Sequence, residues 1–289
     1  SLNMKNNENK SVLILGFFDG IHAGHRKVIQ NAVTYAQNNK AKTILITFKT
    51  SPAEYFNKSI KYIFPRNYSY KLIKKLSVDE IIEQDFSEFV NMSAQNYLEN
   101  FLIQQFSPIA IFTGFNYTFG KNKQEGSEFL QLKSFEYNYK YFSLPAESID
   151  DKIISSTYIK DLLKNGNLEL ANKLLCSNFT IESKVIKGLQ LGRKLGFPTA
   201  NLIYPDNIVK LPYGVYSAKY ENKKAILNWG IKPTLGLNKE ILELHILDFD
   251  ENLYDKIIHF EIIKKIRDEK KFINLESLKT QIQKDIEAC

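Results

Sequence analysis

The stretch G-L-Q-L-G-R-K-L-G-F-P-T-A-N, residues 188–201, indicates the chemistry that this chain is built for. Glycine recurs in it at every fourth position, at Gly188, Gly192 and Gly196. Glycine allows the backbone to approach a ligand closely, and Arg193 adds a cation between the last two glycines. Pro198 presets the following turn, and Thr199 and Asn201 carry oxygens of the kind that hard cations bind. This order predicts a loop folded over nucleotide phosphates and their Mg²⁺, although a solvent loop between two strands has a similar composition.

The string G-R-K-L-G-F-P-T-A-N-L, residues 192–202, resembles the signature of the riboflavin kinase family. The resemblance implies that the glycine-rich part covers the phosphates of ATP. The residues concerned are Gly188, Gly192, Arg193, Gly196 and Pro198. It also implies that Thr199 and Asn201 hold Mg²⁺ on the nucleotide.

Length and composition are those of a two-domain globular chain. The chain has 289 residues, of which 44% are hydrophobic, and its net charge is +7, from 39 Lys and Arg against 32 Asp and Glu. This balance favours anionic ligands, but the cations are spread along the chain, so we expect nucleotides rather than nucleic acid as partners. No apolar run reaches the length of a membrane span, and two distant cysteines, Cys176 and Cys289, predict a reducing cytoplasm and no disulfide framework.

The N-terminal region reads as a βαβ unit. Residues 11–15 (S-V-L-I-L) form an apolar run typical of a buried strand, and residues 43–48 form the next one. Between them, apolar residues recur with helical spacing at Val28, Ile29, Ala32, Val33 and Ala36. The segment F-F-D-G-I-H-A-G-H, residues 17–25, therefore falls at the carboxyl end of the first strand, where open α/β sheets bind ligands.

Two of the four histidines of the chain, His22 and His25, lie at the start of this expected helix. A helix N-terminus binds phosphates, and imidazoles add hydrogen-bond donors, although ordinary capping or surface histidines are the alternative. The H-A-G-H string resembles the signature of nucleotidyltransferases related to class I tRNA synthetases, and the longer G-F-F-D-G-I-H-A-G-H resembles the version in prokaryotic FAD synthetases. The resemblance implies catalytic roles for both histidines. It implies ATP contacts for Gly16, Phe18, Asp19 and Gly24.

The α/β pattern continues with helices expected at residues 68–76 and 93–105, the second capped by Ser93, and strands at 109–113 and 141–144. The loop G-F-N-Y-T-F-G, residues 114–120, alternates aromatic and polar residues between glycines. This alternation suits ring stacking, and a β-turn with core aromatics would have the same pattern. The loop resembles the flavin-side loop of FAD synthetases, which implies flavin contacts for Asn116, Tyr117 and Phe119.

The segment I-S-S-T-Y-I-K, residues 154–160, places three hydroxyls, from Ser155, Ser156 and Thr157, at the start of an expected helix. Hydroxyls at a helix start make an anion site, and they also serve as plain caps. The segment resembles the one that closes over ATP phosphates in the same family. Lys160 stands where the family has arginine, and Thr50-Ser51-Pro52 stands where the family has P-H-P, so that histidine is absent. These departures weaken the case for efficient adenylyl transfer.

From about residue 179 the pattern changes to alternating strands at short spacing, followed by an expected helix from Asn274. This region predicts a small closed β-barrel with a C-terminal helix. The whole chain is then an α/β Rossmann-like nucleotidyltransferase domain, residues 4–176, followed by a riboflavin kinase barrel, residues 177–289.

The strand I-L-E-L-H-I-L, residues 241–247, carries the expected base. Glu243 and His245 share a face that is either a barrel mouth or an exposed edge. The match to the E-x-H segment of riboflavin kinases favours the first and implies that Glu243 is the base. Asn228 and Arg267 resemble the family's flavin-side residues.

Together the resemblances imply a bifunctional enzyme. It would phosphorylate riboflavin to FMN and then transfer an adenylyl group from ATP to FMN, giving FAD and pyrophosphate. The expected partners are riboflavin, FMN, ATP and Mg²⁺, without a membrane, in a monomer or weak homo-oligomer. Two alternatives stay open: a riboflavin kinase whose N-terminal domain is a flavin or nucleotide sensor, and an RNA-binding or regulatory protein.

Overall fold

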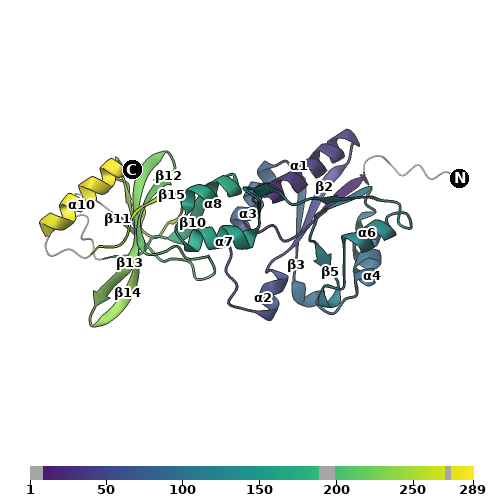
Figure 1. Ribbon diagram of the computed structural model, residues 1–289, viewed down its shortest axis with the longest axis horizontal. Helices are drawn as coiled ribbons and strands as arrows, with labels where there is room; N and C mark the ends of the chain where they lie inside the picture. Colours follow the sequence, from purple (N-terminus) through teal and green to yellow (C-terminus); the bar gives the residue numbers. More distant parts are fainter. Residues whose placement is uncertain (1–8, 189–198, 271–274) are drawn as a thin grey trace. The chain divides into compact units, whose positions relative to one another are not determined.

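The computed structural model describes residues 9–188, 199–270 and 275–289. The chain forms two compact units, which Figure 1 shows. Unit 1 comprises Ser1–Ile60 and Arg66–Ser155, and unit 2 comprises Lys61–Pro65 and Ser156–Cys289. The helices over residues 156–175 therefore belong to compact unit 2. The predicted boundary between the two functional domains, at residue 176, stays a prediction.

Unit 1 is built on a parallel sheet with the strand order β3-β2-β1-β4-β7, which is the order of a doubly wound sheet. Its strands are β1 (Ser11–Leu15), β2 (Lys42–Phe48), β3 (Glu80–Gln84), β4 (Ala110–Gly114) and β7 (Lys140–Leu144). The register pairs Leu13 with Ile44 on one side and with Ile111 on the other. The sequence prediction of strands at the positions of β1, β2, β4 and β7 is confirmed.

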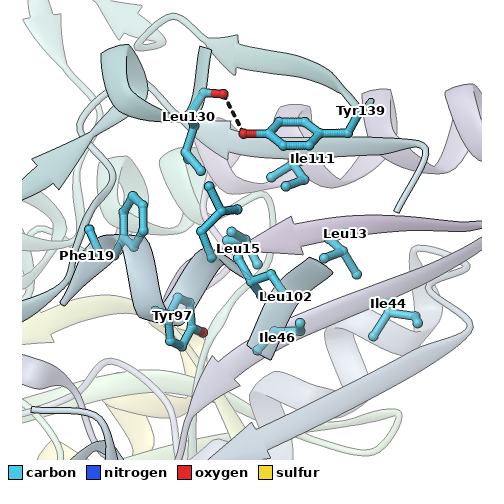
Figure 2. Close-up of a cluster of buried hydrophobic side chains, with 12 residues drawn as sticks. Leu13, Leu15, Ile44, Ile46, Tyr97, Leu102, Ile111, Phe119, Leu130 and Tyr139 are labelled. Atoms are coloured by element: carbon cyan, nitrogen blue, oxygen red, sulfur yellow. Dashed lines mark hydrogen bonds between the residues drawn. The ribbon is translucent and has the colours of Figure 1, made fainter. Parts of the chain in front are cut away.

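Both faces of this sheet are covered, which explains why β1 is buried throughout and apolar from Val12 to Leu15. The helix α1 (Ala23–Asn38) buries the predicted apolar stripe from Val28 to Ala36. On the opposite face a cluster gathers Leu13 and Leu15 with residues of β2, β4 and a helical segment, as Figure 2 shows. Alternate residues of β1 therefore serve the two faces. Tyr139 Oη donates to Leu130 O at 2.5 Å and satisfies a polar atom within this cluster.

The helical segment on that face is the one expected at residues 93–105. Ser93 caps it as predicted, accepting from Asn96 N at 3.1 Å. Its middle is π-helical rather than α-helical, a departure that the residue pattern does not show. It consists of α4 (Ala94–Asn96), η3 (Tyr97–Ile103) and α5 (Gln104–Phe106). The remaining elements of unit 1 are α2 (Pro52–Phe56), α3 (Arg66–Lys75), η2 (Phe86–Glu88), β5 (Thr118–Phe119), η4 (Lys121–Lys123), β6 (Glu125–Gly126), α6 (Ser127–Lys133), β8 (Ser148–Ile149) and β9 (Lys152–Ile153).

Unit 2 is built on an antiparallel sheet with the strand order β10-β15-β12-β13-β14-β11. Its strands are β10 (Phe179–Lys184), β11 (Thr199–Leu202), β12 (Gly214–Tyr220), β13 (Lys223–Thr234), β14 (Leu237–Ile246) and β15 (Ile257–Arg267). The predicted closed barrel is wrong in one respect: the sheet curls but stays open. Between its two edges the described residues form only an isolated bridge, Ile186 to Asn201, because β10 ends at Lys184 and β11 has four residues. Closure needs a continuous ladder between the edge strands.

Three helices complete the described part of unit 2: α7 (Ser156–Lys164), α8 (Leu168–Leu175) and α10 (Leu275–Ala288). The predicted start of the last helix, Asn274, lies outside the described residues. Figure 1 shows α10 in yellow beside the sheet, and two contacts attach it there. Asp285 pairs with Arg267, and Cys289 Sγ lies 3.3 Å from Ala225 O.

Candidate functional site

The loop over residues 16–25, which we name the histidine loop, joins β1 to α1. His22 is the N-cap of α1, and its Nδ1 accepts from Gly24 N at 3.0 Å and from His25 N at 3.3 Å. The rings of His22 and His25 stack with their centroids 3.6 Å apart. A Cβ at Gly24 would lie 2.9 Å from His22 Cε1, so this stack requires glycine between the two rings.

The backbone of the histidine loop is strained. Phe18, Gly20 and Ile21 have φ values of 61°, 87° and 48°. A β-branched residue such as isoleucine strongly disfavours this left-handed region, and strain of this kind gathers at functional sites. Gly16 is required as well, since a Cβ there would lie 2.8 Å from Phe18 Cζ. The predicted contact Asp19 is buried in the same loop.

Burial sets the protonation of the two histidines. Burial lowers the pKa of His22 to about 4, against a smaller opposite effect of a backbone hydrogen bond. Burial, and then the charges of His22 and Arg66, hold the pKa of His25 well below its usual value. Both rings are therefore neutral near pH 7. Because Nδ1 of His22 accepts two N–H groups, its proton is assigned to Nε2, which can donate to a phosphate oxygen.

The predicted flavin-side loop divides between surface and core. Asn116 is exposed, whereas Phe119 is 8% exposed and belongs to the hydrophobic cluster of Figure 2. Tyr117 stacks on Phe119 with centroids 5.7 Å apart. Phe119 thus has the core role that the plain alternative described, and the flavin contacts of the loop stay a prediction.

The hydroxyl-rich segment lies where the chain passes from one unit to the other. Ser155 ends unit 1, whereas Ser156, Thr157 and Lys160 belong to α7 of unit 2. Lys160 Nζ donates to Lys61 O at 2.9 Å, also within unit 2. The contact of this segment with ATP phosphates at the histidine loop stays a prediction.

In unit 2, strand register aligns four predicted residues that are distant in sequence. Asn201 of β11 pairs with Glu243 of β14, which pairs with Asn228 of β13. Asn228 pairs with Val215 of β12, and Val215 pairs with Arg267 of β15. Directly opposed residues of antiparallel strands share a face. We name this line of five residues the carboxylate row.

Glu243 lies inside the sheet, since β14 is flanked by β13 and β11, and its side chain is only 18% exposed. The exposed-edge alternative is therefore excluded. The carboxylate has a cationic partner, because its Oε1 lies 3.2 Å from Lys232 Nζ.

Lys232 is a residue of this site that the sequence did not indicate. It follows Asn228 by four residues on β13, so the two side chains share a face of that strand. The hairpin of β13 and β14, which pairs Asn228 with Glu243, brings Lys232 within reach of the carboxylate. The ion pair therefore depends on strand pairing, which no local sequence pattern reports.

A cavity of about 250 Å³ lies beside the row in unit 2. Three of its lining residues are predicted ligands, namely Gly188, Thr199 and Asn201. The side chain of Asn201 lies so close to Gly188 that a Cβ at Gly188 would be 2.0 Å from Asn201 Cγ. Glu243 does not line this cavity, so Asn201 is the residue that the row and the cavity share. Gly192, Arg193, Gly196 and Pro198 lie outside the described residues.

The cavity has a second wall that sequence reasoning missed. It is formed by the turn after β14, residues 249–254, and by Lys187. Lys187 Nζ lies 5.6 Å from the centre of the Tyr254 ring. The turn was expected only as a connection, because its acidic residues are those of an ordinary solvent turn.

Arg267, at the far end of the row, is already engaged. Its Nε and Nη2 each donate at 2.9 Å to the carboxylate of Asp285 on α10, and Gln281 Nε2 donates to the same carboxylate. The pair is buried, with side-chain exposures of 14% for Arg267 and 3% for Asp285. Arg267 therefore fixes α10 to the sheet, and its flavin contact stays a prediction.

Oxygen donors characterise the expected metal position. The residues that the structure describes contain no cluster of three His, Cys, Asp or Glu side chains able to hold a metal ion. A hydroxyl from Thr199 and an amide oxygen from Asn201, completed by phosphate oxygens and water, fit the hard cation Mg²⁺.

A parallel α/β unit with a strained histidine loop, followed by an antiparallel unit with a carboxylate row, defines a two-domain enzyme of nucleotide chemistry. Comparison with family models agrees with this class: FAD synthetase matches residues 4–158 and riboflavin kinase matches residues 175–289. The chain belongs to the family of bifunctional riboflavin kinase/FMN adenylyltransferases.

Relatives support this assignment over nearly the full length. A bifunctional riboflavin kinase/FMN adenylyltransferase of Buchnera aphidicola subsp. Schizaphis graminum is 37% identical, over 99% of this chain and 95% of the relative. One of Haemophilus influenzae is 32% identical, over 96% and 92%. A crystal structure described as a macrolide-efflux protein from Streptococcus pneumoniae has a TM-score of 0.85 and 28% identity, covering 96% of this chain and 93% of the other. None of the helices in the described part of this chain is long and apolar enough to cross a membrane.

Proposed function

We propose that this chain makes FAD from riboflavin in two ATP-dependent steps, one in each unit. The observation that carries the proposal is the separation of two chemistries. The carboxylate row of unit 2 holds Glu243 in register with Asn201, while the histidine loop of unit 1 holds two neutral imidazoles at a helix N-terminus.

Phosphorylation of riboflavin belongs to unit 2. The ribityl hydroxyl is a neutral alcohol, so it benefits from a base, and Glu243 takes its proton. Thr199 and Asn201 would hold Mg²⁺, which neutralises phosphate charge when bound. The cavity beside Asn201 receives the nucleotide, and Asn228 and Arg267 lie along the same row toward the flavin.

Adenylyl transfer belongs to unit 1. The FMN phosphate is already an oxyanion, so this step requires charge neutralisation and alignment rather than a base. Nε2 of His22 donates to a phosphate oxygen, and Gly16, Phe18, Asp19 and Gly24 shape the loop around ATP. The resemblance to the family supports Ser155, Ser156, Thr157 and Lys160 as ATP-binding residues. It likewise supports Asn116 and Tyr117 as the flavin side, with Phe119 holding their loop from the core.

The setting that we propose is the cytoplasm, with the protein as a monomer or weak homo-oligomer. Both cysteines, Cys176 and Cys289, are free thiols, which agrees with a reducing compartment. The boundary between the two functional domains lies near residue 176 of the sequence.

A flavin separation assay with two reciprocal variants tests the proposal. Glu243→Gln is expected to lower riboflavin phosphorylation by about 10²–10⁴-fold and to leave the conversion of FMN to FAD intact. His25→Ala is expected to lower FAD formation by about 10²–10³-fold, so that FMN accumulates. Glu240→Gln, an exposed neighbour on the same strand as Glu243, is the control.

The same assay separates the alternatives. Accumulation of FMN without any FAD in the unmodified protein would favour a riboflavin kinase with a sensor domain. Loss of both activities in both folded variants would contradict the division of labour. Salt-sensitive RNA binding would favour a nucleic-acid role.

A further inference from the structure

None of the residues that the sequence indicated in the histidine loop carries a positive charge for the adenylyl-transfer site of unit 1. Burial keeps His22 and His25 neutral near pH 7. At the position of the missing histidine, Ser51 caps α2, with its Oγ accepting from Glu54 N at 3.0 Å. Two substrates that both carry phosphates must nevertheless be held together, so a cation is required nearby.

Arg66, the first residue of α3, lies at this edge of the sheet. Its Nη2 donates to Phe17 O at 3.0 Å, to Thr47 Oγ1 at 2.9 Å and to Phe48 O at 3.1 Å. Phe17 belongs to the histidine loop, and Thr47 and Phe48 end β2. The guanidinium therefore bridges the carboxyl ends of β1 and β2, where ligands bind to sheets of this kind.

The position of the guanidinium is fixed by more than these bonds. Its Cζ lies 4.0 Å from the centre of the Phe17 ring and 5.1 Å from that of Tyr70. It is also close enough to His25 for its charge to contribute to the lowered pKa of that ring, after burial and His22. Arg66 thus lies within electrostatic reach of the histidine pair.

Several nitrogen atoms beside the histidine loop still have hydrogen-bonding capacity. Nε and Nη1 of Arg66 are buried and have no hydrogen-bond partner among the residues that the structure describes, and the same holds for Nδ1 of His25 and Nη2 of Arg26. Buried polar groups are normally paired, and an unpaired charged donor is costly. Donors of two arginines beside one loop suit a ligand with several anionic oxygens, which a guanidinium binds with two parallel N–H groups.

We propose that Arg66 is a phosphate-binding residue of the adenylyl-transfer site and supplies the permanent charge that the neutral histidines do not. The inference rests on the proposed function of unit 1. In the reaction, an oxygen of the FMN phosphate forms a bond to the α-phosphorus of ATP, the bond from that phosphorus to the bridging oxygen breaks, and pyrophosphate leaves. Arg66 exchanges no proton; it offsets the charge of the phosphates.

The test compares Arg66→Met and Arg66→Lys with Lys27→Met in the full-length protein. Lys27 is a matched control because it is an exposed cation of α1, paired with Glu147 at 2.6 Å. We expect Arg66→Met to lower kcat/KM for FAD formation by about 100-fold. Arg66→Lys should lower it about tenfold, because a point charge replaces the fork. Lys27→Met should change little, and riboflavin phosphorylation should be unchanged in all three.

Separate titrations of ATP and FMN show which phosphate Arg66 binds, because the KM of that substrate rises. Inhibition by added pyrophosphate should weaken in Arg66→Met if the ATP side is concerned. If Arg66 only connects the two loops structurally, Arg66→Met would lower the melting temperature without a selective rise in one KM.

The possible outcomes separate the role of Arg66 from the proposed function of unit 1. If folded Arg66→Met makes FAD at the unmodified rate with unchanged KM values, the inference is wrong while the proposed function stands. If the unmodified protein makes no FAD, the proposed function of unit 1 fails instead. If Arg66→Met does not fold, Arg66→Lys decides, and unchanged KM values for ATP and FMN in that variant overturn the inference.

Discussion

The histidine loop and the carboxylate row are held in different ways. The loop is local: ten consecutive residues, a helix cap and a strained backbone bring His22 and His25 together. The row is non-local: four antiparallel pairings bring together residues from five strands. The proposed phosphate site can thus be encoded in one segment, whereas the proposed base, Glu243, is placed beside the proposed metal ligand, Asn201, only by the register of a whole sheet.

The largest expected effect tests the ion pair between Arg267, at one end of the carboxylate row, and Asp285 of α10. Asp285→Asn removes the charge that pairs with the buried Arg267, and breaking such a pair costs about 3–5 kcal/mol. Urea unfolding monitored on unit 2 should show this loss. Asp268→Asn, at a side chain 86% exposed and paired with Lys265, should produce no measurable change. Equal effects of the two variants would mean that α10 is not fixed through Arg267.

A second prediction concerns the histidine loop, in which burial keeps the two histidines neutral. The pKa of His22 falls from 6.5 to about 4 on folding, so the unfolded chain binds the proton first as the pH falls. The stability contributed by neutral His22 is complete above pH 6.5 and is lost between pH 6.5 and 4, by about 3 kcal/mol.

His22→Asn measures this contribution, because asparagine retains a capping oxygen and does not titrate. The free energy of unfolding of unit 1 should fall less steeply between pH 7 and pH 4 in this variant than in the unmodified protein. Parallel pH profiles for the two proteins would contradict burial of a neutral His22.

The smallest expected effect concerns the residue shared by the row and the cavity. Asn201→Ala removes a proposed Mg²⁺ ligand and should raise the Mg²⁺ concentration needed for riboflavin phosphorylation by roughly tenfold to a hundredfold. Asn228→Ala, on the other side of Glu243, should leave the Mg²⁺ requirement unchanged. A shift of equal size in both variants would count against Asn201 as the ligand.

The order of elements could be predicted well from the residues. The apolar run of β1 and the stripe of α1 follow from short-range periodicity and are confirmed. The alternation in β14 is confirmed from Ile241 to Leu244, whereas His245 is buried like its neighbours. The cap at Ser93 follows from the same kind of local rule. The π-helical stretch from Tyr97 to Ile103 was missed, because the apolar spacing there resembles that of an α-helix.

The candidate sites were predicted unevenly. The histidine loop and Glu243 stand out as motifs, whereas Arg66 and Lys232 are single cations among many. Arg66 lies 41 residues from His25, and only the packing of α3 against the ends of β1 and β2 gives it a role. The open barrel was missed because strand patterns show the alternation of each strand but not whether the two edges pair.

By itself the sequence determined the class of each half, the position of the two histidines at a helix N-terminus and the alternation that places Glu243 on the face opposite to Leu242 and Leu244. These properties depend on residues within a few positions of one another, where capping, glycine and periodicity act. Tertiary structure alone decided that Asn201, Glu243, Asn228 and Arg267 form one line, that the sheet stays open and that Arg66 meets the loop. Those outcomes depend on pairing between segments that are distant in the sequence. The free energy of such pairing cannot be read from either segment alone.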